Sequence, residues 1–342
     1  MAIDAVAASA GTGTDEEGLH KQYDTPLGLA HTTMQALKNR IKLHYDLASD
    51  YYLNLWGEHI HHGYWATEES KAGDSKEVAQ LNLIKLLLEI AGAPVGQGSG
   101  VLDVGCGVGG TTRYLASELG ATVTGITISS KQVQIATRLT KTAAAASSSS
   151  EGSSSAADAD ADGFILLGKG KVRFLELDAE KMGEFFAAAE GTFDAVWISE
   201  ALSHFPNKAL FFRNTQKLLR TGGKLVLADW FKANDLSEAQ FETDIKPIED
   251  GMLLPPLCTQ SDYVQRASEA GLSVVGNGPK DISGDVAKTW DISWSLVQNP
   301  ALWGFAFSQG RDGIAFLQSF RAMRRGYAAG TFRYAVMAFE KK

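Results

Sequence analysis

Short apolar runs alternate with amphipathic, helix-like segments over most of the chain. The apolar runs occupy residues 99–105, 121–127, 171–178, 193–199, 224–230, 272–277 and 331–342. Segments with the apolar spacing of helices follow the first four of them. Regular alternation of strands and helices is typical of βαβ units. The pattern therefore predicts an α/β protein with a doubly wound, mostly parallel, seven-stranded sheet.

Four segments fall outside this alternation. Residues 1–25 are acidic, lack the basic start and apolar core of a secretory signal, and predict a disordered tail. Residues 143–163 contain only alanine, serine, glycine and acidic residues, which predicts a solvated low-complexity loop. Residues 231–270 and 285–328 are helical or irregular, and we expect them to cap the carboxyl edge of the sheet. Residues 26–342 then form a single domain that contains this loop as an insertion.

Charge and cysteine content narrow the function classes. The net charge of −8 argues against a nucleic-acid-binding protein, which would carry a basic face. No apolar run approaches the ~20 residues of a membrane span. The two cysteines, Cys106 and Cys258, have the spacing of neither a disulfide framework nor a metal site. We therefore expect a cytoplasmic monomer or homodimer with no nucleic-acid partner and no transmembrane segment.

A dense cluster of glycines follows the first apolar run. The stretch VLDVGCGVGGTTRYLA, residues 101–116, has glycine at 105, 107, 109 and 110, soon after Asp103. Ligands of doubly wound sheets bind at the carboxyl ends of the strands, where glycines allow backbone amides to come close. The spacing formally fits the G-x-G-x-x-G motif of dinucleotide-binding proteins, so a nicotinamide-dependent oxidoreductase is one alternative.

The acid before these glycines indicates a different ligand. LDVGCGVGG resembles motif I of class I S-adenosylmethionine-dependent methyltransferases, and GATVTGITISSKQVQIA is similar to the second-strand region of a particular subgroup. That subgroup contains γ-tocopherol methyltransferases, sterol methyltransferases and cyclopropane fatty acid synthases. Like its members, the chain lacks the acid that usually binds the ribose, which weakens the dinucleotide alternative. The resemblance covers roughly residues 40–342 and implies a Rossmann-like methyltransferase fold with a lid at residues 40–66.

The resemblance also implies the cofactor, S-adenosyl-L-methionine, and the residues around it. These are Tyr45, His61, Asp103, Gly105, Cys106, Gly107, Thr127, Gln132, Asp178, Ala179 and Ser199. Asp178 matches an acid near the adenine amino group, although it could instead cap the next helix. His59, His61 and His62 beside Glu58 are compatible with zinc, but they lack an obvious partner cluster. The resemblance explains this stretch as part of the lid, so we predict no metal.

The fourth strand is followed by the candidate catalytic groups. Glu200, His204 and Pro206 match the E-x-x-x-H-x-P pattern of the tocopherol and sterol enzymes. His204 is a candidate general base, since histidine titrates near working pH, and Glu200 is the rival base. Cyclopropane synthases place a glutamate directly before this histidine. Ser203 stands there instead, which argues against carbocation chemistry on lipid alkenes.

These features predict an S-adenosylmethionine-dependent methyltransferase (EC 2.1.1.-). The methyl acceptor would be a small lipophilic molecule such as a prenylated quinol, a sterol or a secondary metabolite, methylated by in-line displacement. One alternative is an N-, O- or S-methyltransferase of natural-product biosynthesis. Another is a non-catalytic, methyltransferase-like regulator that only binds the cofactor.

Overall fold

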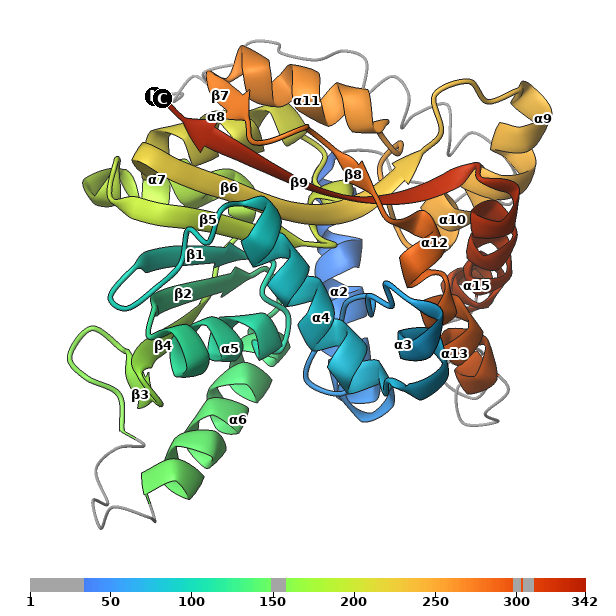
Figure 1. Cartoon of the computed structure of the whole chain (residues 1–342). Helices are drawn as coiled ribbons and strands as arrows, with labels where there is room; N and C mark the ends of the chain where they lie inside the picture. Colours follow the sequence, from blue (N-terminus) through green and yellow to red (C-terminus); the bar gives the residue numbers. More distant parts are fainter. Residues whose placement is uncertain (1–33, 149–157, 298–302, 304–310) are drawn as a thin grey trace, which may run out of the picture.

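A nine-stranded sheet forms the centre of the molecule (Figure 1). The computed structural model describes residues 34–148, 158–297, 303 and 311–342, so the predicted tail at 1–25 lies outside the described residues. The strands are β1 (Gly100–Val104), β2 (Thr122–Thr127), β3 (Ile165–Leu167), β4 (Gly170–Glu176), β5 (Phe193–Ser199), β6 (Leu219–Lys232), β7 (Leu272–Val274), β8 (Lys280–Asp281) and β9 (Phe332–Lys341). Their order is β3-β4-β2-β1-β5-β6-β9-β7, with β8 also paired to β9.

The direction of the strands confirms a doubly wound, mostly parallel sheet. β4, β2, β1, β5 and β6 pair in parallel, while β7 and β8 both run antiparallel to β9 and so point the same way as those five. Only β3 and β9 run in the opposite direction. The predicted number of seven strands was too low, because β3 and β8 have three and two residues and are too short to show a pattern.

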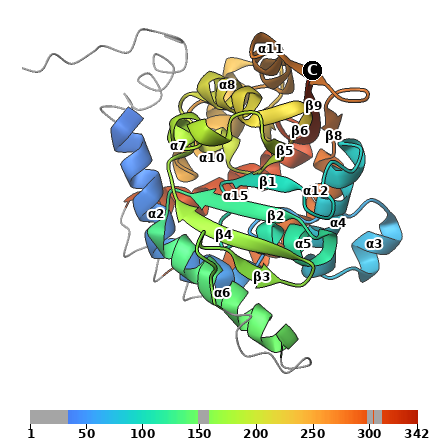
Figure 2. The ribbon, with the colours of Figure 1, turned by 90° about the vertical axis from the view of Figure 1, so that its left-hand side faces the viewer.

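Helices cover both faces of the sheet (Figure 2). One face packs against α4 (Lys76–Ile90), α5 (Gly110–Leu119) and α6 (Ser130–Ser148), and the other against α7 (Met182–Phe185), α8 (Lys208–Leu218) and α11 (Gln260–Glu269). Neighbouring strand residues alternate between the two cores, as in β1, where Val101 joins the first core and Leu102 the second. All of the central strands are therefore buried on both sides, which accounts for their continuous apolar runs.

The predicted low-complexity loop is partly helical. α6 continues to Ser148, so residues 143–148 are helix rather than loop, because a run of alanines has the highest helix propensity. Residues 158–163 form a turn in which Asp160 Oδ1 accepts hydrogen bonds from the amides of Asp162 and Phe164. The intervening residues 149–157 lie outside the described part of the chain.

A layer of helices lies at the carboxyl edge of the sheet. Its members are α2 (Met34–Trp56), α9 (Glu238–Gln240), the π-helical turn η4 (Phe241–Ile245), α10 (Lys246–Gly251), α12 (Ser283–Val286), α13 (Lys288–Val297) and α15 (Arg311–Ala329), with α3 (Glu68–Gly73) beside them. One part of the predicted cap was wrong. Helix α11 lies on the sheet, where Tyr263 packs against Phe212 and Phe231. No helix in the described ranges is long and apolar enough to cross a membrane.

Candidate active site

The glycine loop joins β1 to α5 at the point where the strand order reverses. A Cβ atom at Gly105 would lie 2.4 Å from Ala201 Cβ, and one at Gly110 would lie 2.2 Å from the carbonyl oxygen of Glu58. A Cβ atom at Gly109 would meet the Phe174 ring at 2.6 Å. Only Gly107 of this loop faces open space. Other parts of the protein therefore pack directly against the backbone at Gly105, Gly109 and Gly110. Gly107 instead leaves room for a ligand next to the main chain.

A cavity opens over this loop, between the carboxyl ends of the strands and helix α2. Eight of the predicted cofactor-binding residues line it together: Tyr45, Gly105, Gly107, Thr127, Gln132, Asp178, Ala179 and Ser199. They come from α2, from the first turn of α6, and from the ends of β1, β2, β4 and β5 or the residues just after them. Such an edge is the usual ligand site of a doubly wound sheet.

The end of β2 presents neutral polar groups to this cavity. The Thr127 hydroxyl donates a hydrogen bond to Gln132 Oε1 at 2.5 Å, and both side chains are buried. Ser129 supports them, since its Oγ accepts a hydrogen bond from the amide of Gln132. Amide and hydroxyl groups can hydrogen-bond a sugar in place of the missing acid.

Ion pairs hold the end of β4 to helix α2, which contains the first part of the predicted lid. Lys38 of α2 donates to Asp178 Oδ2 at 2.9 Å and also contacts Glu180, and both Lys38 and Glu180 line the cavity. Lys42, one turn later, donates to Glu176 at 2.7 Å and to the carbonyl of Ile128 at 3.0 Å. Sequence reasoning missed Lys38 and Glu180, because their pairing joins segments 142 residues apart.

Three predicted cofactor contacts lie outside the lining of this cavity. Asp103 is buried behind the loop, where Oδ2 accepts a hydrogen bond of 2.6 Å from the Thr112 hydroxyl, and burial raises its pKa to about 7. Cys106 is half-buried, and burial raises the pKa of its thiol. His61 lines a second cavity instead.

This second cavity has about 740 Å³ of empty space and mostly aromatic walls. Its lining includes His44, Tyr45, Tyr52, Trp56, His61, His62, His204, Trp230, Trp290, Phe316 and Phe320. Ile41, Tyr45, Ile60, Glu200 and His204 line both cavities. These five residues form what we call the shared wall. Glu200 is the only acidic residue in the lining of the second cavity, and no lysine or arginine in the described part of the chain lines it.

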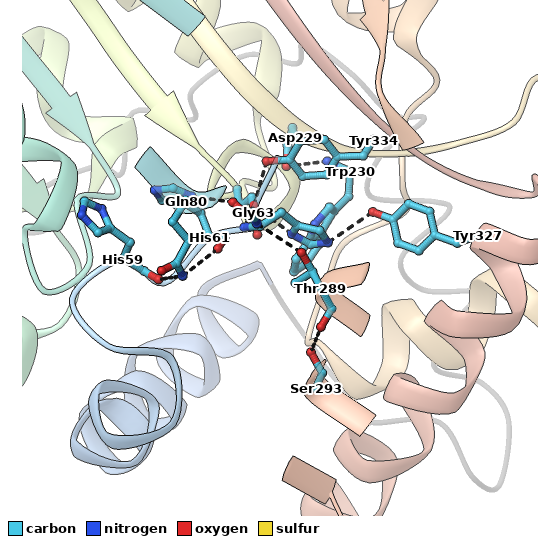
Figure 3. Close-up of polar contacts among 12 residues, drawn as sticks. His59, His61, Gly63, Gln80, Asp229, Trp230, Thr289, Ser293, Tyr327 and Tyr334 are labelled. Atoms are coloured by element: carbon cyan, nitrogen blue, oxygen red, sulfur yellow. Dashed lines mark hydrogen bonds and ion pairs between the residues drawn. The ribbon is translucent and has the colours of Figure 1, made fainter. Parts of the chain in front are cut away.

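Glu200 is anchored through one oxygen. Its Oε1 accepts hydrogen bonds from the His62 amide at 2.6 Å, His62 Nδ1 at 2.9 Å and the Tyr334 hydroxyl at 2.7 Å. His62 Nε2 in turn lies 3.3 Å from the Tyr327 hydroxyl, which approaches from α15 (Figure 3). Burial acts to raise the pKa of Glu200, but His62 outweighs it and leaves the pKa below its ordinary value. The carboxylate is therefore ionised at neutral pH.

His204 lies on the short turn η3 (Leu202–His204), which follows β5. Its Nε2 is 3.2 Å from the Tyr45 hydroxyl. The buried ammonium of Lys208 donates to the carbonyls on either side, those of Ser203 at 3.3 Å and Phe205 at 3.0 Å. Burial, with smaller contributions from His44 and Lys208, lowers the pKa of His204 to about 3. The imidazole is therefore neutral at working pH.

The histidine-rich loop serves as a connector in this structure. Gln80 donates to the carbonyl of His61 at 3.2 Å and also contacts that of His59, while the Gly63 amide donates to Thr289 Oγ1 at 3.1 Å (Figure 3). Within the described residues, no group of three or more histidine, cysteine, aspartate or glutamate side chains could hold a metal ion. The loop thus joins α4, the cap and Glu200. The sequence showed its histidines but not these partners.

Comparisons with known proteins agree with this architecture. The family described as Methyltransferase domain matches residues 102–227, and the family described as Mycolic acid cyclopropane synthetase matches residues 31–151. The chain is 29% identical to the chloroplastic tocopherol O-methyltransferase of Arabidopsis thaliana, over 91% of this chain and 84% of that protein. It is 28% identical to the probable tocopherol O-methyltransferase, chloroplastic, of Oryza sativa subsp. japonica, over 89% and 78%.

The fold likewise resembles that of a solved structure, a mycolic acid cyclopropane synthase complexed with SAH and CTAB. The TM-score is 0.69 with 19% sequence identity, over 89% of this chain and 98% of that chain. The family matches meet at the glycine loop and the strands around it, which carry the motifs of the sequence. These matches confirm the predicted resemblance to the class I S-adenosylmethionine-dependent methyltransferases, a family whose cofactor is S-adenosylmethionine.

Proposed function

We propose that the protein transfers the methyl group of S-adenosylmethionine to a small lipophilic acceptor held in the aromatic cavity. The shared wall carries this proposal, because it brings a cofactor-sized cavity and an apolar cavity to the same side chains. Methyl transfer by in-line displacement needs such an arrangement, in which the two reactants meet end to end and water is kept out.

The residues around the first cavity fit the cofactor. Open space over Gly107 would accept its methionine end close to backbone amides, and the shared wall lies beside it. Gln132 and Thr127 would bind the ribose hydroxyls, and Asp178 with Ala179 would bind the adenine. When bound, the cofactor supplies an activated methyl group on a sulfonium. The protein then has to position the partners and exclude water.

His204 is the proposed general base, since its neutral imidazole lines both cavities. For a hydroxyl acceptor, the proton lost as the methyl bond forms would pass through the Tyr45 hydroxyl, which lies against Nε2, to the imidazole. The Tyr45 hydroxyl, 3.2 Å away, orients the ring. A base with so low a pKa is weak, but a hydroxyl becomes strongly acidic as it is methylated. Glu200 is less suited to this role, because three donors already stabilise its charged form.

The lining of the second cavity favours an aromatic or prenylated acceptor. Ring-lined walls without a positive charge bind apolar molecules and disfavour anions. The tocopherol O-methyltransferases among the relatives support a prenylated quinol, and a sterol or a secondary metabolite would also fit an apolar site of this kind. Location in the cytoplasm and the state of a monomer or homodimer stay predictions.

The test is turnover of methyl-labelled S-adenosylmethionine with a panel of prenylated quinols, sterols, phenols and amines. Cofactor binding is measured separately by calorimetry. We expect labelled product with at least one lipophilic acceptor and none with a carboxylate-bearing analogue of it. Binding of the cofactor without turnover of any acceptor would instead indicate a non-catalytic regulator.

A further inference from the structure

The two carboxylate oxygens of Glu200 have different surroundings. Oε1 accepts all three hydrogen bonds described above, from His62 and Tyr334. Within the described part of the chain, Oε2 accepts none. The side chain is only 8% exposed, and it lines both cavities. Glu200 thus brings one oxygen that accepts no hydrogen bond from the described residues to the wall between the two cavities.

This orientation is held from several separate segments. His62 comes from the loop after α2, Tyr334 from β9, and Tyr327 of α15 holds His62 in place. The backbone of Glu200 has a φ of 54°, a left-handed conformation that is unfavourable for a glutamate. Strain of this kind persists where the surrounding structure enforces it, and such sites are often functional. The contacts to Oε1 therefore aim Oε2 rather than satisfy the whole carboxylate.

An oxygen of this kind is unfavourable in an apolar cavity unless a donor reaches it. A charged oxygen that is withdrawn from water needs a hydrogen bond in exchange, because leaving it without one is unfavourable. The aromatic walls offer little compensation. We propose that Glu200 Oε2 binds an O–H or N–H group of the methyl acceptor, on or next to the reacting atom, and that His62 and Tyr334 are its positioning residues. This inference rests on the proposed function and narrows its acceptor to protic molecules.

This hydrogen bond would make the protein discriminate strongly between acceptors with and without an O–H or N–H group. A site built to hydrogen-bond a substrate hydroxyl or amine rejects an analogue that lacks it, because the buried partner is left unpaired. Hydroquinones, phenols and amines satisfy Oε2, whereas an isolated alkene does not.

The substitution Glu200→Gln gives a direct test. The three donors to Oε1 would hold the amide oxygen of the glutamine in that place, so its NH₂ group would face the cavities. An acceptor of hydrogen bonds is thereby replaced by a donor of nearly the same shape. The probes are trimethylhydroquinone and its dimethyl ether, kept reduced, with their dissociation constants measured on the full chain saturated with S-adenosylhomocysteine.

We expect the wild-type protein to bind the hydroquinone at least about tenfold more tightly than the ether, as one charged hydrogen bond implies. In Glu200→Gln this preference should vanish or reverse. In Tyr334→Phe it should shrink, and the pKa of Glu200 seen in the pH dependence of probe binding should rise, with cofactor affinity within twofold of wild type. Equal binding of both probes by the wild type, binding of neither, or an unchanged preference in Glu200→Gln would overturn the proposal. Selective binding without any methylation would contradict the proposed function and leave this inference standing.

Discussion

The ammonium of Lys38 lies 2.9 Å from Asp178 Oδ2, so the lid helix is bonded to the residue that we assign to the adenine. Lys38 and Asp178 are only 14% and 22% exposed, which reduces screening of the pair by solvent. Helix α2 is therefore fastened to the end of β4 within the lining of the cofactor cavity.

Removing this contact should weaken cofactor binding. In Lys38→Met, the carboxylates of Asp178 and Glu180 lose their counter-ion, and helix α2 loses its ion pairs with these two residues. We expect the dissociation constant of S-adenosylmethionine to rise about fivefold, the equivalent of about 1 kcal/mol. Calorimetry measures this value. Lys131→Met is the control, since it removes the exposed pair of α2 with α6 through Asp50 and should change the affinity less than twofold.

Two glycines of the loop should respond differently to alanine. Gly105→Ala forces a left-handed alanine at φ 71° and a Cβ contact of 2.4 Å, and together these destabilise the fold by about 2–5 kcal/mol. Gly107→Ala at φ 55° meets no atom within 4 Å, so it should cost only about 1–2 kcal/mol and mainly reduce cofactor affinity. Denaturant unfolding and calorimetry separate the two effects. Equal losses of stability would show that the crowding at Ala201 relaxes freely.

His204→Gln should lower single-turnover rates by about 10²–10⁴-fold for a hydroxyl acceptor, with little change in cofactor affinity. The folded-state pKa of about 3 lies below the ordinary value of 6.5. The unfolded chain therefore takes up a proton at higher pH than the folded one, and the wild type loses stability as the pH falls from 6.5 toward 3. The variant should lose less over this range. A rate within twofold of wild type would rule out His204 as the base for that acceptor.

Lys208 should affect His204 through the turn that carries it. In Lys208→Met, the carbonyls of Ser203 and Phe205 lose their donor, and a positive charge that lowers the pKa of His204 disappears. We expect that pKa to rise, which moves the acid limb of the pH–rate profile to higher pH. NMR titration of labelled histidine measures the shift directly. Lys217→Met, at an exposed position in the last turn of the same helix, should leave the profile unchanged.

Glu249 predicts the opposite dependence on pH. Burial raises its pKa to about 7, above the ordinary 4.5, so the folded chain keeps a proton that the unfolded chain has released. Its contribution to stability is present at pH 4 and is lost as the pH rises through 7. Glu249→Gln, which can still accept from the amide of Leu257, should therefore raise the melting temperature at pH 8 more than at pH 4. Glu242→Gln, at an exposed site seven residues earlier, should have no such effect.

The sequence was sufficient to predict those cavity residues that closely follow a strand or end it. Thr127, Asp178 and Ser199 meet in one cavity because parallel strands present their carboxyl ends at one edge. It failed where a side chain comes from a distant segment. Glu200 lies 138 residues from His62 and 134 from Tyr334, and no local pattern encodes such pairs. Helix α11 was misplaced for a related reason, since an amphipathic pattern shows that one face is buried but not against what.

Strand β9 lies between β6 and β7 and also holds β8, although it is made after all three. During synthesis, β7 and β8 therefore cannot pair with β9 until the chain has been made through residue 341. The same strand carries Tyr334, so Glu200 also waits for one of its three donors. A nascent chain contains its glycine loop and the parallel strands around it well before β9 has been made. We therefore expect the nascent chain to bind the cofactor before it can orient an acceptor. A chain stalled on the ribosome before β9 should bind S-adenosylmethionine but should not yet orient an acceptor.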